Sequence, residues 1–147
     1  SSAASDVYKR QEDTALIRLP DYVGQSEIVD LMSSTFSGNA TVQEIILPKY
    51  LRILRENAFS GCTALRCIWI PKTVRDIPED VFLHCDALEA VYYEGSKQMW
   101  EKLPIRRYRD CVSSKGMSAK FTEKRVPLAG NETLFRATVY FDCIWES

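Results

Sequence analysis

Apolar residues in this chain recur at a fixed interval of 23 positions, and this interval organises most of the sequence. The most regular column of such positions holds Phe36, Phe59 and Phe82. The same interval relates Pro48 to Pro71, Leu54 to Ile77, Cys62 to Cys85, Leu65 to Leu88, and Ile68 to Val91. A unit this short cannot bury its apolar side chains alone, so the pattern predicts repeats that stack on one another.

Each repeat combines the pattern of a strand with that of a turn region. Ile68 and Ile70 alternate with residues suited to an outer face, which is the period of a strand, and Pro71 follows where the strand ends. The stretch 78–82 is long enough for about one helical turn. The pattern therefore predicts strands on one side of the domain and short helical turns on the other.

Cys62 and Cys85 are interpreted as structural, because they share one column of the repeat with Asn39. Small residues buried at a bend fit such a column, where Cys fills space and acts as a weak donor. The five cysteines are Cys62, Cys67, Cys85, Cys111 and Cys143. Their odd number and wide spacing do not predict a disulfide framework, and a single histidine leaves too few ligands for a zinc site.

The repeat reads P-x-x-[LV]-x-x-[LI]-x-x-x-[AV]-F-x-x-C-x-x-L-x-x-[IV]-x-[IY], and residues 92–100 continue it as YYEGSKQMW. This pattern resembles the BspA-type leucine-rich repeats found in many bacterial surface proteins. Residues 130–140, GNETLFRATVY, look like the stretch that forms a final strand in that family. The resemblance covers residues 14–103 and 130–142. It implies an α/β, right-handed leucine-rich-repeat solenoid of about three 23-residue repeats, closed by a C-terminal strand at 130–142.

Two segments depart from the family pattern, and a third lies outside it. Five extra residues stand between Pro20 and Leu31, and residues 104–128 form an insertion with seven Lys or Arg and two Asp or Glu. Residues 1–11 contain DVYKRQ, which resembles a translated transposase end sequence. We interpret 1–11 as a disordered leader or a sequencing scar. One leucine-rich-repeat domain is expected over 12–147.

Composition and charge exclude several classes of function. A formal net charge of −1 does not favour a polyanion ligand for the whole chain, and no element typical of nucleic-acid reading is present. No apolar run reaches the roughly 18 residues that a membrane span needs. The scattered glycines form no phosphate-binding loop. We expect no nucleic acid, no membrane insertion, no metal and no cofactor.

The candidate binding site is a column of outward residues on neighbouring strands. Its members are Arg18, Ile46, Trp69, Tyr92 and Tyr140. The next column holds Leu16, Glu44, Cys67 and Ala90, of which Glu44 is included in the site. Large apolar surfaces mark interaction sites, and Trp and Tyr are enriched at binding hot spots. The alternative is that the insertion or another repeat covers this column, which would make it internal packing.

The insertion is the second candidate, because its basic residues could meet an anionic partner. They are Arg106, Arg107, Arg109, Lys115, Lys120, Lys124 and Arg125. A solvated loop balanced against the acidic repeats is the favoured interpretation. Two sequons, at Asn39 and Asn131, are discounted for a chain that resembles bacterial proteins.

Catalysis is not expected. His84, Cys85 and Asp86 are adjacent in sequence, but neighbours on an irregular bend rarely point at one reaction centre. Cys111 beside Asp110 has no second histidine to activate its thiol.

The expected function is non-catalytic binding of a host or microbial protein or glycan through the concave sheet. The family resemblance implies a cell-surface or secreted location. A structural capping or spacer segment of a longer array is the alternative. Repeat sequence begins close to the leader, which predicts a fragment whose first strand, 15–19, is an exposed edge. Self-association through that edge is expected, and a monomer in size-exclusion chromatography at high concentration would argue against it.

Overall fold

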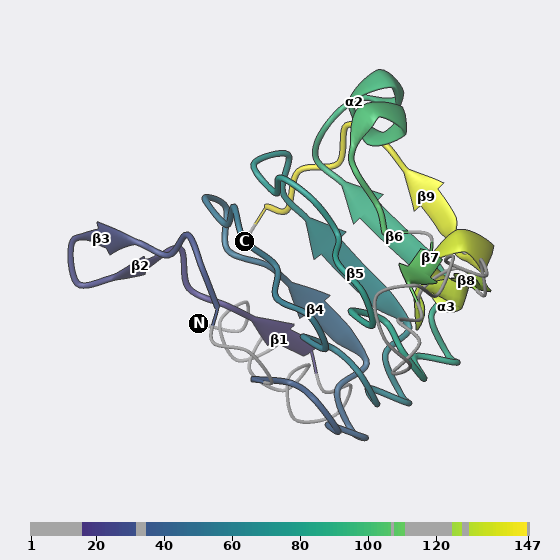
Figure 1. Ribbon diagram of the computed structural model, residues 1–147. Coiled ribbons are helices and arrows are strands. Elements are labelled where there is room, and N and C mark those ends of the chain that lie inside the picture. Colours follow the sequence, from purple (N-terminus) through teal and green to yellow (C-terminus); the bar gives the residue numbers. More distant parts are fainter. Residues whose placement is uncertain (1–15, 32–34, 107, 111–124, 128–129, 147) are drawn as a thin grey trace, which may run out of the picture.

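The computed structural model describes residues 16–31, 35–106, 108–110, 125–127 and 130–146. Its main feature is a five-stranded sheet in the order β1-β4-β5-β6-β9 (Figure 1). The strands are β1 (Leu16–Arg18), β4 (Glu44–Ile46), β5 (Cys67–Ile70), β6 (Ala90–Tyr93) and β9 (Thr138–Tyr140). Every neighbouring pair is parallel, so each connection returns along the other side of the domain.

The strand register follows the repeat interval seen in the sequence. Ile45 lies opposite Ile68, and Ile68 lies opposite Val91. All three side chains are fully buried, with 0% exposure, on the face of the sheet that meets the turns. The predicted alternation is confirmed in β5, where buried Ile68 and Ile70 alternate with half-buried Cys67 and Trp69.

The core lies between the sheet and the turns, and the phenylalanine column runs through it. The ring centroids of Phe36 and Phe59 are 5.9 Å apart, and those of Phe59 and Phe82 are 5.7 Å apart. Backbone hydrogen bonds join the turns of successive units, for example from Phe59 N to Val81 O at 3.0 Å. Each unit thus covers the apolar side chains of its neighbour, as stacked repeats must.

The two cysteines of the repeat column lie in this core. The Sγ of Cys62 donates to the carbonyl oxygen of Phe36 at 3.1 Å, and that of Cys85 to Phe59 at 3.0 Å. Burial raises the pKa of Cys62 to about 11 and that of Cys85 to about 12, so both thiols are protonated at neutral pH. Their predicted structural role is confirmed.

The turn side differs from the expected helical turns. Residues 78–82 form turns because Asp80 takes a left-handed conformation with φ 59°, which interrupts any helix. A second bend follows at His84, with φ 60°, where the two earlier repeats have Gly38 and Gly61, each with φ 78°. The repeat therefore depends on left-handed bends, which glycine adopts without strain and histidine does not.

The segment after the insertion closes this end of the array. It begins with α3 (Glu132–Arg136) and continues into β9, so the expected terminal strand occupies only the last part of 130–142. Asn131 is fully buried, and its Nδ2 donates to Pro78 O at 3.0 Å. Thr133 donates its hydroxyl to Phe82 O at 3.1 Å, as the cysteines do for the preceding units. The hydroxyl thus continues the cysteine column into the closing segment.

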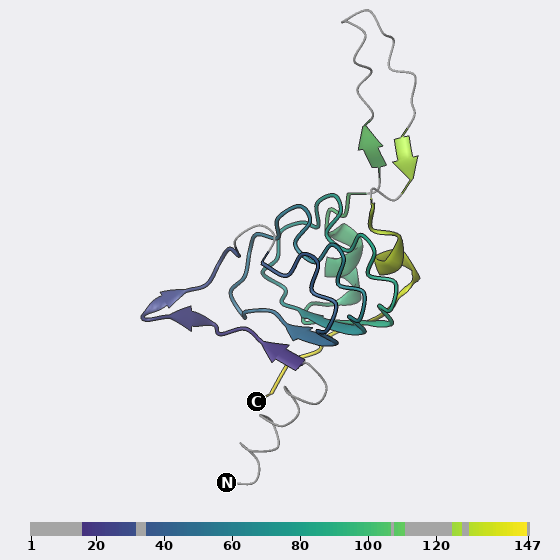
Figure 2. The ribbon, with the colours of Figure 1, turned by 90° about the horizontal axis from the view of Figure 1, so that it is seen from below.

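The remaining elements lie outside the repeat pattern. The five extra residues of the first unit form the hairpin of β2 (Tyr22–Val23) and β3 (Ser26–Glu27). Two strands, β7 (Tyr108–Asp110) and β8 (Arg125–Pro127), pair within the insertion. Both pairs project from the main body in Figure 2. Helix α2 (Lys97–Lys102) follows β6, with the Ser96 side chain accepting from Met99 N at its start.

Candidate functional site

The outward column expected from the sequence forms on the open face of the sheet. Arg18 lies opposite Ile46, Ile46 opposite Trp69, Trp69 opposite Tyr92, and Tyr92 opposite Tyr140. This list follows the five strands in order. The strand register therefore matches the expectation at every position, including β9, which lies beyond the insertion.

Three rings of this column stack into what we call the aromatic row: Trp69, Tyr92 and Tyr140. The centroids of Trp69 and Tyr92 are 4.4 Å apart with their planes at 23°. Those of Tyr92 and Tyr140 are 5.3 Å apart with their planes at 18°. Parallel strands about 4.8 Å apart place equivalent side chains at this spacing, so the stack follows from the sheet itself.

The aromatic row is most accessible at its Tyr140 end. Tyr140 is 48% exposed, while Trp69 and Tyr92 are half-buried. The indole Nε1 of Trp69 donates to Glu44 Oε1 at 2.9 Å, which holds the ring in one orientation. Burial raises the pKa of Tyr92, which therefore keeps its phenolic proton and can donate a hydrogen bond. The row offers flat apolar faces with polar groups at their edges.

Cys67 lies beside the row, in register with Glu44 on one side and Ala90 on the other. Its side chain is half-buried. Burial, and then the nearby Glu44 carboxylate, raise the pKa of its thiol. Nucleophilic chemistry needs a lowered thiol pKa, so this position is suited to packing against the row.

Two members of the expected site differ from the aromatic row. Ile46 is only 3% exposed and lies between Arg18 and Trp69 in the column. Arg18 is half-buried and donates to Leu19 O at 2.9 Å and to Asp21 Oδ2 at 3.3 Å. We correct the interpretation of Ile46 to internal packing, and Arg18 is held by its own strand end.

A later segment, residues 142–146, is what sequence reasoning missed; we call it the return segment. It follows β9 and runs back across β6 and β5 (Figure 1). The ring of Trp145 meets Trp69 edge-on, with centroids 5.2 Å apart and planes at 74°. Half-buried Phe141, Cys143 and Trp145 alternate with exposed residues. The sequence itself does not show this alternation, because the exposed Ile144 is apolar too.

Comparison with known proteins agrees with this geometry. The family model described as "BspA type Leucine rich repeat region (6 copies)" matches residues 17–103. The chain belongs to this family. None of the curated proteins compared with it matches.

A solved structure supports the same fold. The crystal structure of a leucine-rich cell surface protein from Faecalibacterium prausnitzii is similar, with a TM-score of 0.54 and 29% identity. The similarity covers 60% of this chain and 28% of that protein. The matched part of this chain therefore spans less than a third of that protein's length.

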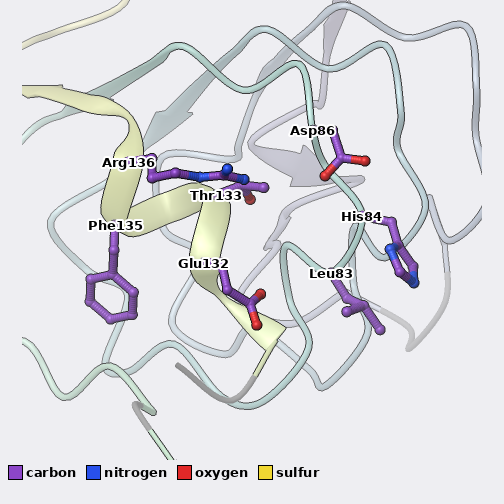
Figure 3. Close-up of a pocket in the computed structure, with 7 residues that line it drawn as sticks. All are labelled: Leu83, His84, Asp86, Glu132, Thr133, Phe135 and Arg136. Atoms are coloured by element: carbon purple, nitrogen blue, oxygen red, sulfur yellow. The ribbon is translucent and has the colours of Figure 1, made fainter. Parts of the chain in front are cut away.

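The turn side of the leucine-rich repeats carries a cleft of about 420 Å³ (Figure 3). It lies between the last repeat bend and α3. Its lining residues are Leu83, His84, Asp86, Glu132, Thr133, Phe135 and Arg136. The imidazole of His84 points away from α3 in Figure 3, and the neighbouring Cys85 is buried in the core. His84, Cys85 and Asp86 therefore share no reaction centre.

Few of the remaining candidates, which are the basic residues of the insertion, the Cys111 thiol and the sequon asparagines, have side chains that the structure describes. Arg106 of the insertion forms an ion pair with Glu79, with Nε and Oε1 3.3 Å apart. Arg107, Lys115, Lys120 and Lys124 lie outside the described residues, as do the side chains of Arg109 and Arg125 and the expected Cys111 thiol. Asn131, one of the two sequon asparagines, is fully buried.

Within the part of the chain that the structure describes, no three His, Cys, Asp or Glu side chains cluster in a way that could hold a metal ion. No helix within it combines the length and apolar character of a membrane span.

Proposed function

We propose that this leucine-rich-repeat chain is a non-catalytic binding module, on a right-handed array of about three repeats, that recognises a partner through the aromatic row. The observation that carries the proposal is the stack of Trp69, Tyr92 and Tyr140 on the open face of the sheet. The site would be in place before binding, because each ring is supported by its neighbour and Trp69 is held by Glu44. A preformed site loses little side-chain entropy when a partner arrives.

The side chains of the row suit recognition better than stability. Trp and Tyr supply large contact areas with few rotatable bonds and are enriched among hot spots. An exposed ring such as Tyr140 contributes little to the core, since nearly half of its surface is in water. We propose a host or microbial protein or glycan as the partner. A cell-surface or secreted location is supported by the family and by the cell surface protein of Faecalibacterium prausnitzii.

A second candidate, a structural spacer, is favoured by one observation. The return segment packs Trp145 against Trp69, which is how a chain covers its own apolar surface. In this case the row would complete the fold and any partner would bind elsewhere.

The experiment that separates these two functions is a binding screen. The chain is probed against arrays of glycans and extracellular-matrix proteins beside a Trp69→Ala/Tyr92→Ala double variant. A control, Tyr22→Ala/Val23→Ala, removes two exposed apolar side chains from the β2 strand, away from the row.

We expect a ligand that binds the native chain and the control with similar affinity, and the folded double variant at least about tenfold more weakly. Truncation of a single hot-spot residue can already reduce affinity by this factor. Retention of the ligand by the double variant would move the site off the row. The absence of any ligand for all three proteins would favour the spacer function.

A further inference from the structure

The return segment reaches the aromatic row by a defined path. After β9 the backbone turns at Asp142, which takes a left-handed conformation with φ 55°. Asp142 N then donates to Gly95 O, and Cys143 N donates to Tyr93 O, both at 2.9 Å. These two bonds tie the start of the segment to the end of β6, and Trp145 lies on Trp69 of β5 two residues later.

The contacts beyond this start are few. Ile144 is 68% exposed, and Trp145 contributes one ring contact. The indole Nε1 of Trp145 is buried, yet it has no hydrogen-bond partner in the structure, whose described part includes the whole return segment. A buried donor without an acceptor opposes docking, because it has given up its bond to water. The segment is therefore seated on the row with one polar group of its aromatic side chain left unsatisfied.

The seated segment indicates what kind of partner fits this face. It is an extended polypeptide that uses backbone N–H groups on carbonyl oxygens of Tyr93 and Gly95, and an aromatic side chain on Trp69. A peptide offers both of these features at once. Recognition of an extended chain by backbone hydrogen bonds and a side-chain anchor is an established mode of peptide binding.

We propose that the aromatic row binds an extended peptide with an aromatic anchor, and that the return segment occupies this site in cis until such a peptide displaces it. This inference rests on the proposed function and names its partner and its regulation. Because the segment is attached to β9, its effective concentration at the row is in the millimolar range or above, as for other short tethers. A free peptide must therefore compete with it.

The test uses a fluorescent peptide covering residues 141–146, with serine in place of Cys143, titrated by anisotropy into the full chain. Three forms of the chain are compared first: the native protein, Trp145→Ala and Ile144→Ala. Trp145→Ala removes the aromatic anchor, and Ile144→Ala is a control at an exposed position in the same segment. A Trp69→Ala/Trp145→Ala variant removes both rings, with Tyr92→Ala/Trp145→Ala as the substitute if it does not fold. A control peptide carries alanine at the position of Trp145.

We expect Trp145→Ala to bind the peptide at least about tenfold more tightly than the native chain and Ile144→Ala, because removing the resident anchor frees the site. The double variant and the control peptide should show no binding. Equal affinities for the native chain and Trp145→Ala, or no binding to Trp145→Ala up to millimolar peptide, would overturn the inference.

The array ligands separate this inference from the function on which it rests. A ligand that requires the row but binds the native chain and Trp145→Ala equally overturns the competition by the return segment and leaves the binding function intact. A glycan that gains affinity in Trp145→Ala while the peptide does not bind overturns the peptide as partner. If the peptide binds Trp145→Ala more tightly than the native chain and no array ligand is found, the inference is supported. That result would count against the glycans and extracellular-matrix proteins of the arrays as partners.

Discussion

Two aromatic columns cross the same repeats, one inside the domain and one on its open face. Phe36, Phe59 and Phe82 stack within the core, with centroids 5.7–5.9 Å apart. The aromatic row stacks on the outer face of the sheet at 4.4–5.3 Å. Both columns are produced by the same parallel stacking of units, so geometry alone does not distinguish them.

Their surroundings do distinguish them. The residues Phe59 and Phe82 have no exposed surface, and their rings carry no polar atoms. The backbone carbonyl oxygen of Phe59 accepts a hydrogen bond from Cys85 Sγ. The rings of the row carry an indole N–H or a phenol and keep part of their surface in water. The inner column therefore stabilises the fold, while the outer column keeps the exposed surface on which the proposed recognition depends.

The largest expected loss of stability comes from a substitution at the centre of the inner column. Phe59→Ala should lower the free energy of unfolding by about 3–5 kcal/mol, because it leaves a cavity in a fully buried site. Trp69→Ala, at a half-buried position, should lower it by only about 1–2 kcal/mol. Urea unfolding of both variants measures the difference. Equal losses would show that the row belongs to the core as much as the phenylalanines do.

An intermediate effect follows from the thiols beside the inner column. The pKa of Cys85 is raised from 9.0 to about 12 in the folded chain, so above pH 9 the unfolded chain loses this proton first. Stability is therefore fully present below pH 9 and falls as the pH rises toward 12. Between pH 8 and about pH 10.5 the thiol should contribute a loss of about 2 kcal/mol.

Cys85→Ser isolates this term, because serine keeps a donor for Phe59 O but does not titrate in this range. Under reducing conditions, the native chain should lose about 2 kcal/mol more than Cys85→Ser over the same change of pH. Parallel losses in the two proteins would contradict the assigned burial of the thiol.

The smallest expected change in stability comes from substitutions at the left-handed bends of the repeats. His84→Gly should stabilise the chain by about 0.5 kcal/mol, because relief of a left-handed conformation with φ 60° outweighs the greater conformational entropy that glycine gives the unfolded chain. Gly61→Ala is the opposite control, since its φ is 78° and a Cβ would lie 3.2 Å from Gly38 Cα. Thermal unfolding should move upward for His84→Gly and downward for Gly61→Ala; the reverse order would contradict the account of the bends.

The repeat and its register could be predicted from the sequence because they depend on local periodicity. A period of 23 residues aligns Ile68 with Val91 and Trp69 with Tyr92, and the parallel strands keep that alignment. The expected turn at 78–82 was wrong in type, because the left-handed conformation of Asp80 is not visible from its residue type alone.

The candidate site could be predicted only in part. The repeat interval predicts which residues form the column, but the exposure of each residue depends on what covers it. Ile46 is buried and Trp69 is met by Trp145, a contact between residues 76 positions apart in the chain. Such a contact has no periodic signature, since residues 142–146 lie beyond the last repeat.

The most direct test of the binding account is a calorimetric titration of the strongest array ligand with the native chain and Tyr140→Ala. Tyr140 is 48% exposed on the edge strand β9, so its removal should leave the unfolding midpoint within about 2 °C. We predict that the ligand binds Tyr140→Ala about tenfold more weakly, or not at all. Unchanged affinity in this stable variant would contradict the claim that the aromatic row is the recognition surface.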